Sequence, residues 1–206
     1  MTASVPLVFV VDDEEAVADS IAMLLHSVGL QTRLFSDARK FLEHYQADMA
    51  GCLLLDVRMP KMGGLELQDE LNRRRCTLPV IFITGHGDVP MAVEAMRAGA
   101  LDFLQKPFKD DELIRRVQRA LDEDAEQRAL LRQREEVARR WAELTVRERE
   151  VAQRISAGEA NKVVAAELAI SERTIELHRA RIMQKMGVRS LAQLVRMVIA
   201  LAEEPR

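Results

Sequence analysis

The sequence predicts a doubly wound α/β domain built on a five-stranded parallel sheet, followed by a smaller all-helical domain. Short apolar runs alternate with helical patterns through the first 121 residues, which is typical of a parallel sheet covered by helices. Four of these runs end on residues suited to binding phosphate or a metal ion. The remainder of the chain carries helical patterns only.

The first part of the chain divides into five strand–helix units. The predicted strands are residues 7–11, 32–35, 52–56, 80–84 and 101–105, and the predicted helices are 14–28, 37–46, 64–74, 88–98 and 109–121. Gly29 and Gly99 stand just past two of these helices, where glycine commonly ends a helix. Five such units favour the flavodoxin-like strand order 2-1-3-4-5.

A helical linker is predicted over residues 122–140. Neither Gly nor Pro occurs from Phe108 to Ala157, and the segment is rich in helix-forming residues. A weak heptad pattern, broken at several positions, runs through Leu113, Val117, Ala120, Leu131, Ala138 and Trp141. Two interpretations remain open, a coiled-coil pairing and a solvated spacer helix.

The last part, residues 141–206, is predicted to be a helix-turn-helix domain of four helices. Thr145 and Glu148 form a capping-box pattern before a helix that ends at Gly158. Three further helices are predicted at about 161–168, 172–186 and 190–202. Ser171 and Ser190 are suited to begin helices, and Gly187 is suited to end one. The short turn after Leu168 fits a helix-turn-helix.

The composition limits the class of protein. The net charge is −3 and 48% of the residues are hydrophobic, which allows compact cores. The first domain is acidic and the tail is mildly basic, so the tail permits nucleic-acid binding. No apolar run approaches the ~20 residues of a membrane span, and no signal peptide is indicated. Cys52 and Cys76 do not suggest a disulfide framework, so a cytoplasmic protein without a membrane partner is expected.

The apolar runs deliver a specific set of side chains to one edge of the predicted sheet. Asp12 and Asp13 follow the first run, Asp56 the third, Thr84 the fourth and Lys106 the fifth. Ligands in open parallel sheets bind at the carboxyl ends of the strands, where these residues would meet. Carboxylates suit Mg²⁺, and a shielded carboxylate can attack phosphorus.

The new negative charge would need a hydroxyl and an ammonium beside it, which Thr84 and Lys106 offer, while Gly85 leaves room for the incoming group. Each residue alone has an ordinary explanation, as a helix cap, a loop aspartate or a solvated lysine. The combination at successive strand ends favours a phosphoryl site.

These residues resemble the receiver domain of two-component response regulators over residues 1 to about 121. The motifs are VVDDEE, LLLDVRMPKMGG, ITGHGD and KPF, and the segment GHGDVPMAVEAMRAGALDFLQKPF looks like the FixJ branch. The resemblance implies a CheY-like fold in which a sensor histidine kinase phosphorylates Asp56. It implies Mg²⁺ held by Asp12, Asp13, Asp56 and the main-chain carbonyl of Arg58.

The resemblance also assigns roles in the response to phosphorylation. Lys106 and Thr84 would hold the phosphoryl oxygens, and Phe103 occupies the position of the aromatic switch residue. Arg58 and His86 stand where the family tunes the lifetime of the phosphoryl group. The expected chemistry is self-phosphorylation from a phosphodonor and slow self-dephosphorylation, so the protein is not expected to be a turnover enzyme.

The helix predicted at 172–186 has two faces. Ile175, His178, Ile182 and Met186 form the stripe expected to be buried. Glu176, Leu177 and Ala180 on the opposite arc are expected to contact bases, and Arg173 or Arg181 a base or a phosphate. Arg179 and Lys185 on the flanks are expected to contact phosphates, and Thr174 also belongs to the predicted DNA-binding set. On the pattern alone, a packed and solvated helix of a regulatory bundle is the alternative.

The tail resembles the LuxR-type helix-turn-helix through LTVREREV, NKVVAAELAISERTIELHRARIMQKMGV and RSLAQLV. Some branches of that family have Lys where Glu176 stands, so their base preference does not transfer. The last helix carries an apolar stripe of Leu191, Leu194, Val195, Val198 and Leu201. Part of this stripe is expected in the core, and the resemblance implies that part pairs two tails on DNA.

The sequence therefore predicts a transcription factor controlled by phosphorylation of Asp56. Receiver dimerisation is expected through an apolar surface at about 88–105, and the dimer would bind a double-stranded DNA operator and act on RNA polymerase. The residues assigned to the dimerisation surface are Val89, Met91, Ala92, Ala95 and Met96. Two alternatives are a Mg²⁺-dependent phosphohydrolase with Asp56 as nucleophile and an interaction protein whose tail binds protein or RNA.

Overall fold

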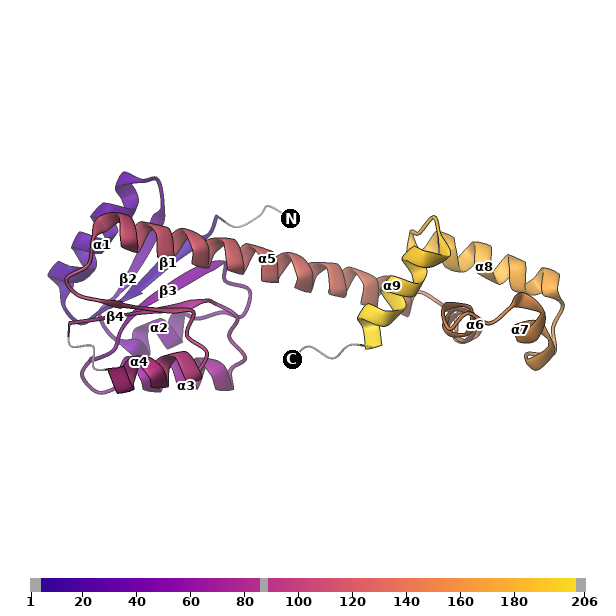
Figure 1. Cartoon of the computed structure of the whole chain (residues 1–206), viewed down its shortest axis with the longest axis horizontal. Coiled ribbons are helices and arrows are strands. Elements are labelled where there is room, and N and C mark those ends of the chain that lie inside the picture. Colours follow the sequence, from indigo (N-terminus) through magenta and orange to yellow (C-terminus); the bar gives the residue numbers. More distant parts are fainter. Residues whose placement is uncertain (1–4, 86–88, 203–206) are drawn as a thin grey trace. The chain divides into compact units, whose positions relative to one another are not determined.

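The computed structural model describes residues 5–85 and 89–202 (Figure 1). The chain divides into two compact units, Met1–Arg128 and Ala129–Arg206. The first unit holds a parallel sheet with helices on both faces, and the second is helical.

The five strands of the first unit form one parallel sheet in the order β2-β1-β3-β4-β5, which confirms the predicted order 2-1-3-4-5. The strands are β1 (Leu7–Val11), β2 (Gln31–Phe35), β3 (Gly51–Asp56), β4 (Val80–Thr84) and β5 (Asp102–Gln105). The central strands β3 and β4 are buried along their whole length, as their unbroken apolar sequences lead one to expect.

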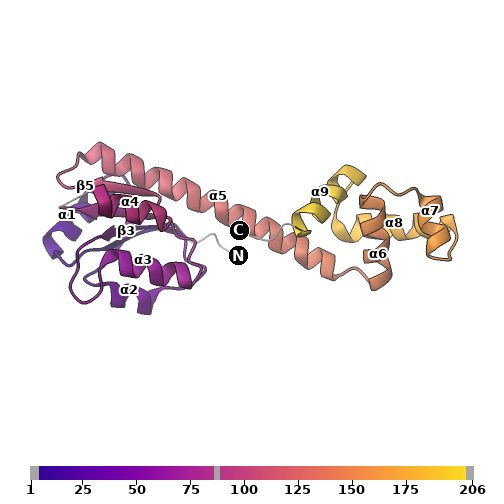
Figure 2. The ribbon, with the colours of Figure 1, turned by 60° about the horizontal axis from the view of Figure 1, so that its bottom comes forward.

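Five helices cover the two faces of this sheet. They are α1 (Glu15–Ser27), α2 (Ala38–His44), α3 (Gly64–Arg73), α4 (Val89–Arg97) and α5 (Asp110–Ala142). Helices α1 and α5 lie on one face, and α2, α3 and α4 lie on the other (Figures 1 and 2). Successive strand residues point to opposite faces, so Leu54 packs with α1 and α5, whereas Leu53 and Leu55 pack with α2, α3 and α4.

Helix α5 continues beyond residue 121 as predicted, but its next two turns are bound to the first unit. Asp124 is only 2% exposed, and its Oδ2 accepts a hydrogen bond of 2.9 Å from the backbone N–H of Gly51. Arg128 Nη1 donates to the carbonyl oxygens of Asp48 and Met49 at 2.6 and 2.7 Å. The first part of the predicted linker is therefore docked rather than a solvated spacer.

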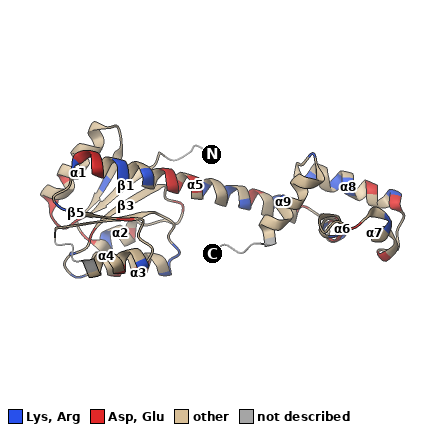
Figure 3. Cartoon of the chain, in the orientation of Figure 1, with Lys and Arg blue, Asp and Glu red and all other residues tan. Residues whose placement is uncertain are grey.

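The residues of the predicted heptad pattern lie in different environments. Leu113, Val117 and Ala120 are fully buried in the core of the first unit, so these positions are already occupied by packing within it. Leu131 is 39% exposed, and along the outer part of α5 basic and acidic residues alternate (Figure 3).

The second unit consists of the end of α5 and four further helices. These are α6 (Val146–Ser156), α7 (Asn161–Glu167), α8 (Glu172–Met186) and α9 (Leu191–Ala202). The predicted capping box is present, because Thr145 Oγ1 accepts from the N–H of Glu148 while Glu148 Oε2 accepts from the N–H of Thr145. Ser171 caps α8, and Gly187 ends it with a φ of 66°.

The core of the second unit joins these helices to the end of α5. Val137 of α5 is buried with Val151, Ile155 and Ile182, and Trp141 packs against the same cluster. Arg140 Nη1 donates 2.8 Å to the carbonyl of Met186, so a side chain of α5 binds the last turn of α8. Residues 137–141, which span the predicted boundary between the linker and the helix-turn-helix domain, thus pack with the helical unit.

Candidate phosphoryl site and nucleic-acid interface

Four strand ends bring the candidate side chains of the first unit together. Asp12 follows β1, Asp56 ends β3, Thr84 ends β4 and Lys106 follows β5. Strands β1, β3 and β4 are consecutive neighbours in the sheet, so the first three residues meet at its carboxyl edge. Lys106 reaches this edge from the outermost strand, and its backbone N–H donates to the carbonyl oxygen of Thr84 at 2.7 Å.

The ammonium of Lys106 bridges two buried carboxylates. Its Nζ lies 2.9 Å from Asp12 Oδ2 and 3.1 Å from Asp56 Oδ1. Asp12 is 3% exposed and Asp56 is 8% exposed, so the three charges interact with little screening by water.

The second oxygen of each carboxylate is also bonded. Asp56 Oδ2 accepts from the backbone N–H of Arg58 at 2.7 Å, and Asp12 Oδ1 accepts from that of Glu14 at 2.9 Å. These bonds fix the direction of both carboxylates. The side chains therefore hold their positions through four separate contacts before any ligand arrives.

Burial and charge set the protonation of this cluster. Burial raises the pKa of Asp56 above its usual value, although Lys106 and the N–H of Arg58 favour the carboxylate. For Lys106, burial opposes the charge, but the hydrogen bonds and charges of Asp12 and Asp56 outweigh it and raise the pKa. A lysine held as an ammonium between two carboxylates is suited to bind a further anionic group.

The other predicted site residues lie around this cluster. Asp13 and Arg58 are exposed, Thr84 is 1% exposed, and Phe103 is half-buried against the core. At Gly85 an added Cβ would meet nothing within 4 Å, so open space adjoins the strand end. His86 lies outside the described residues.

The donor set fits Mg²⁺. Among the residues placed by the structure, no group of three or more His, Cys, Asp and Glu side chains stands ready to hold a metal ion. Mg²⁺ usually takes only one or two carboxylates and completes its shell with water and phosphate oxygens. Asp12 and Asp56, with Asp13 exposed beside them, meet that requirement, and their negative charge exceeds the single positive charge of Lys106.

Gly64 is a site residue that the sequence analysis missed. A Cβ at this position would lie 2.3 Å from the carbonyl oxygen of Asp56 and 2.9 Å from the ring of Phe82. Only glycine therefore lets the start of α3 approach the end of β3 so closely. The paired glycines 63 and 64 after Asp56 were the signal that could have revealed this contact.

The predicted dimerisation surface is only partly available. Met96 is 46% exposed, while Met91 and Ala92 are half-buried. Ala95 is a correction, because its side chain is fully buried in the core and does not belong to the surface. The side chain of Val89 lies outside the described part of the chain.

Helix α8 presents two faces close to those expected. Ile175, Ile182 and Met186 are fully buried, and His178 is half-buried. The residues exposed on the opposite arc are Arg173, Glu176, Leu177, Ala180 and Arg181. Leu177 is 55% exposed, so its side chain can contact a ligand.

Three residues on the flanks of this arc are already bonded within the second unit. Arg179 Nη1 lies 3.1 Å from Asn161 Oδ1, and Thr174 Oγ1 lies 2.8 Å from Ser171 Oγ. Lys185 Nζ forms an ion pair of 2.6 Å with Oε2 of Glu148, which is 3% exposed. Glu148 is thus a second residue whose full role the sequence did not reveal, because the capping box indicates its bond to Thr145 but not its pairing with Lys185.

Comparisons with known proteins agree with this arrangement. Residues 8–118 match the response regulator receiver domain, and residues 142–198 match the luxR family of bacterial regulatory proteins. The transcriptional regulatory protein FixJ of Azorhizobium caulinodans is 47% identical over 205 residues, which cover 100% of this chain and 97% of that protein. The chain belongs to the FixJ-like response regulators.

Other relatives place this response regulator in the same group. Nodulation protein W of Bradyrhizobium diazoefficiens is 44% identical over 93% of this chain and 84% of its own length. The solved structure of the response regulator StyR has a TM-score of 0.87 at 44% identity and covers 95% of this chain and 99% of that one. Full-length FixJ from B. japonicum has a TM-score of 0.60 at 40% identity over 97% and 98%.

The protein is therefore a two-component response regulator with a DNA-binding domain, related to transcription regulators. The phosphohydrolase alternative is not favoured, because relatives that match more than nine tenths of the chain are transcription regulators. Receiver domains generally bind Mg²⁺ at an acidic pocket, and the family works with sensor kinases and DNA. None of the described helices is long and apolar enough to cross a membrane.

Proposed function

We propose that Asp56 is the residue that receives the phosphoryl group from a partner sensor histidine kinase. The observation that carries this assignment is the bridge from Lys106 to both Asp12 and Asp56 at the carboxyl edge of the sheet. An oxygen of the Asp56 carboxylate forms the new bond to phosphorus as the bond from phosphorus to the kinase histidine breaks. The released imidazole keeps the electron pair of that bond.

Asp12, Asp13, Asp56 and the main-chain carbonyl of Arg58 would hold Mg²⁺, which supplies positive charge at the oxygens of the transferring group. The residues of this chain do the remaining work. The N–H of Arg58 orients the Asp56 carboxylate, and Lys106 follows the developing negative charge from the carboxylate to the phosphoryl oxygens. Thr84 ends β4 beside the cluster, and Gly85 follows it with space for the group to enter.

The phosphoryl group then acts on α4 and β5. Its charge draws Thr84 and Lys106 inward and Phe103 follows, because the phosphoryl group adds about two negative charges that need donors. Met96 and the half-buried Met91 and Ala92 provide apolar surface for receiver dimerisation. Phosphorylation thereby shifts an equilibrium between two existing conformations.

The dimer places two copies of α8 on double-stranded DNA. Arg173, Glu176, Leu177, Ala180 and Arg181 face outward and read base edges in the major groove. Thr174, Arg179 and Lys185 contact phosphates, and Lys185 can do so only by exchanging its bond to Glu148. The bound dimer then acts on RNA polymerase.

The test is phosphoryl incorporation and oligomeric state with a small phosphodonor and Mg²⁺. Wild type should gain one phosphoryl group at Asp56 and shift from monomer to dimer, while Asp56→Asn should do neither. A wild-type response in Asp56→Asn would remove Asp56 from this role. If Asp56 is phosphorylated but the protein stays monomeric, the phosphoryl transfer to Asp56 is supported and the dimerisation step is overturned.

A further inference from the structure

Helix α4 ends in a tightly bonded turn. The N–H of Ala100 donates to the carbonyl of Ala95 at 3.0 Å, and the N–H of Gly99 donates to that of Met96 at 3.1 Å. Gly99 has a φ of 94°, so the two bonds form the left-handed Schellman ending of a helix. Ala95 is fully buried and Ala100 is 6% exposed, which ties this turn to the core.

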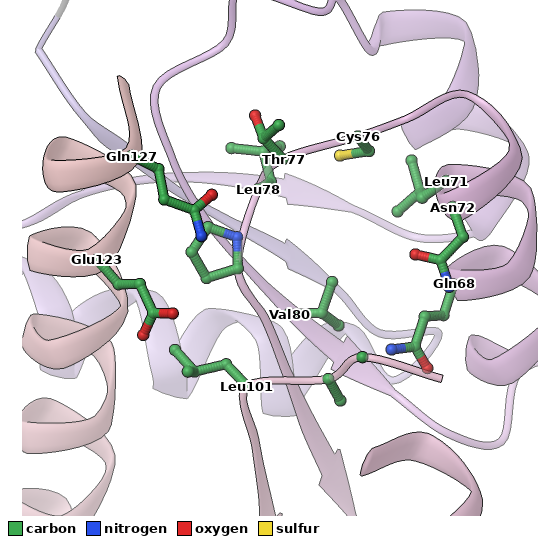
Figure 4. A pocket seen from close by; sticks show the side chains of 13 residues that line it. Gln68, Leu71, Asn72, Cys76, Thr77, Leu78, Val80, Leu101, Glu123 and Gln127 are labelled. Carbon is green, nitrogen blue, oxygen red and sulfur yellow. The ribbon is translucent and has the colours of Figure 1, made fainter. Parts of the chain in front are cut away.

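Two amide side chains of α3 bind the same turn. Gln68 Nε2 donates to the carbonyl of Ala95 at 3.3 Å, and Asn72 Nδ2 donates to that of Ala98 at 2.8 Å. Gln68 and Asn72 are four residues apart, so they project from one face of α3, as Figure 4 shows. The carbonyl of Ala98 lies past the last donors of α4, so Asn72 supplies a bond that the helix cannot make. Gln68 adds a second donor to the carbonyl of Ala95, which already accepts from Ala100.

The packing beside these bonds is incomplete. A hollow of about 360 Å³ adjoins the turn, lined in part by Gln68, Asn72, Leu78, Gly99, Leu101 and Glu123 (Figure 4). At the edge of this hollow, the two amide bonds cross from α3 to the turn.

Gln68 holds its position at a cost. Its side chain is 1% exposed, and its Oε1 has no hydrogen-bond partner within residues 5–85 and 89–202. A buried unpaired acceptor is unfavourable, and a methionine would fill a similar volume without that cost. What the amide gains over methionine at this position is its bond to the carbonyl of Ala95.

We propose that Gln68 and Asn72 are positioning residues that make the C-terminal end of α4 the pivot of this helix. The proposal rests on the proposed function, in which α4 responds to phosphorylation of Asp56. With its C-terminal carbonyls held by α3, a displacement at the other end of α4 turns the helix instead of sliding it. Turning changes the exposure of Met91 and Ala92, whereas the turn at 98–100 stays in place.

The experiment uses full-length protein and backbone amide NMR, with beryllofluoride and Mg²⁺ as the phosphoryl analogue. Asn72→Asp keeps the size of the side chain but removes the donor, and Asn72→Gln keeps a donor. Gln68→Met removes the other donor, and Asp69→Asn is the matched control at an exposed position of the same helix.

Without the analogue, Asn72→Asp should raise the amide exchange rate at 98–100 about tenfold. Loss of one hydrogen bond changes the opening equilibrium of the turn by about that factor. Gln68→Met should act in the same direction, Asn72→Gln should restore part of the protection, and Asp69→Asn should change nothing. If both Asn72→Asp and Gln68→Met keep the wild-type protection at 98–100, the two side chains do not restrain the end of α4, and the proposal fails.

With the analogue, wild type should show shifted amide signals at Met91 and Ala92 but unchanged exchange at 98–100. Asn72→Asp should lose several-fold of the analogue-induced gain in DNA affinity, a change that a purely stabilising role would not cause. Equal changes at both ends of α4 in wild type would overturn the pivot. If DNA affinity does not respond to the analogue in wild type, the proposed function fails. If Asn72→Asp still loses protection at 98–100 in that case, the restraint of the α4 end by Gln68 and Asn72 remains supported.

Discussion

The phosphoryl site and the outward face of α8 are built in different ways. Asp12, Asp56 and Lys106 arrive from three strands, and their polar atoms bind one another or nearby backbone N–H groups. The outward side chains of α8 come from one helix of 15 residues and lie exposed. Substitutions in the phosphoryl site should therefore disturb the folding of the first unit, whereas substitutions on α8 should alter binding alone.

The largest effect is expected for Lys106→Met. Removing the ammonium leaves Asp12 and Asp56 buried and facing each other, so the free energy of unfolding of the first unit should fall by about 3–5 kcal/mol at neutral pH. Denaturant unfolding followed by circular dichroism, with amide exchange in β1 and β3, measures this loss. Lys109→Met, at an exposed lysine nearby, is the control and should stay within about 0.5 kcal/mol.

The pH dependence of the same variant sharpens the interpretation. The pKa of Asp56 already lies above its ordinary value of 3.8, and loss of Lys106 removes a charge that opposed the rise. A carboxyl whose folded pKa is raised contributes stability below its unfolded pKa and loses it as the pH rises through the folded pKa. The deficit of Lys106→Met should therefore shrink as the pH falls toward 3.8, and a deficit independent of pH would contradict the charge argument.

An intermediate effect is expected on α8, and on binding only. Leu177→Ala and Arg181→Ala should each weaken binding to the operator by about 1–3 kcal/mol if they contact bases. Stability should change by no more than about 0.5 kcal/mol, because both side chains are exposed. Titration of labelled duplex DNA measures the first and fluorescence of Trp141 the second. Arg132→Ala on α5 is the control matched in charge, and an equal loss there would indicate general electrostatic binding.

The smallest effect is expected for Glu148→Gln in the second unit. This buried carboxylate loses its charge opposite Lys185, and the free energy of unfolding should fall by about 1–2 kcal/mol at neutral pH. Burial opposes the ionised form, but the bonds from Lys185 and Thr145 outweigh it and lower the pKa of Glu148. That contribution is present above the ordinary value of 4.5 and is lost as the pH falls through the lowered pKa.

The free energies of unfolding of wild type and Glu148→Gln should therefore become equal at low pH. Glu150→Gln is the matched control, because its partner Arg147 and Glu150 itself are both about 40% exposed, and such pairs contribute little. A difference between Glu148→Gln and wild type that persists at low pH would show that shape, and not charge, links Glu148 to Lys185.

The same contrast explains how much the sequence could predict. The strand order and the carboxyl edge followed from apolar runs and their terminal residues, because parallel sheets place strand ends together. The faces of α8 followed from helical periodicity, which needs no tertiary information. Neither rule covers contacts between distant segments, such as Gly64 against the carbonyl of Asp56, Lys185 with Glu148, or Asp124 with Gly51.

Ala95 shows the limit of periodicity on a short helix. The sequence predicts it as part of the apolar dimerisation surface, but α4 has only nine residues and Ala95 packs completely into the core. The docking of the first linker residues was likewise not predictable from periodicity, because it depends on a contact with a distant segment. Asp124 resembles a solvated helix carboxylate in sequence, and only the approach of Gly51 makes it a buried acceptor.

The most direct test of phosphorylation-controlled DNA binding is a titration of operator DNA with wild type and Asp56→Asn, each with and without a small phosphodonor and Mg²⁺. The donor should raise the affinity of wild type about tenfold or more, within the usual range of coupling between sites, and leave Asp56→Asn unchanged. Equal affinities for wild type with and without donor, or an equal gain in Asp56→Asn, would contradict control of α8 by Asp56.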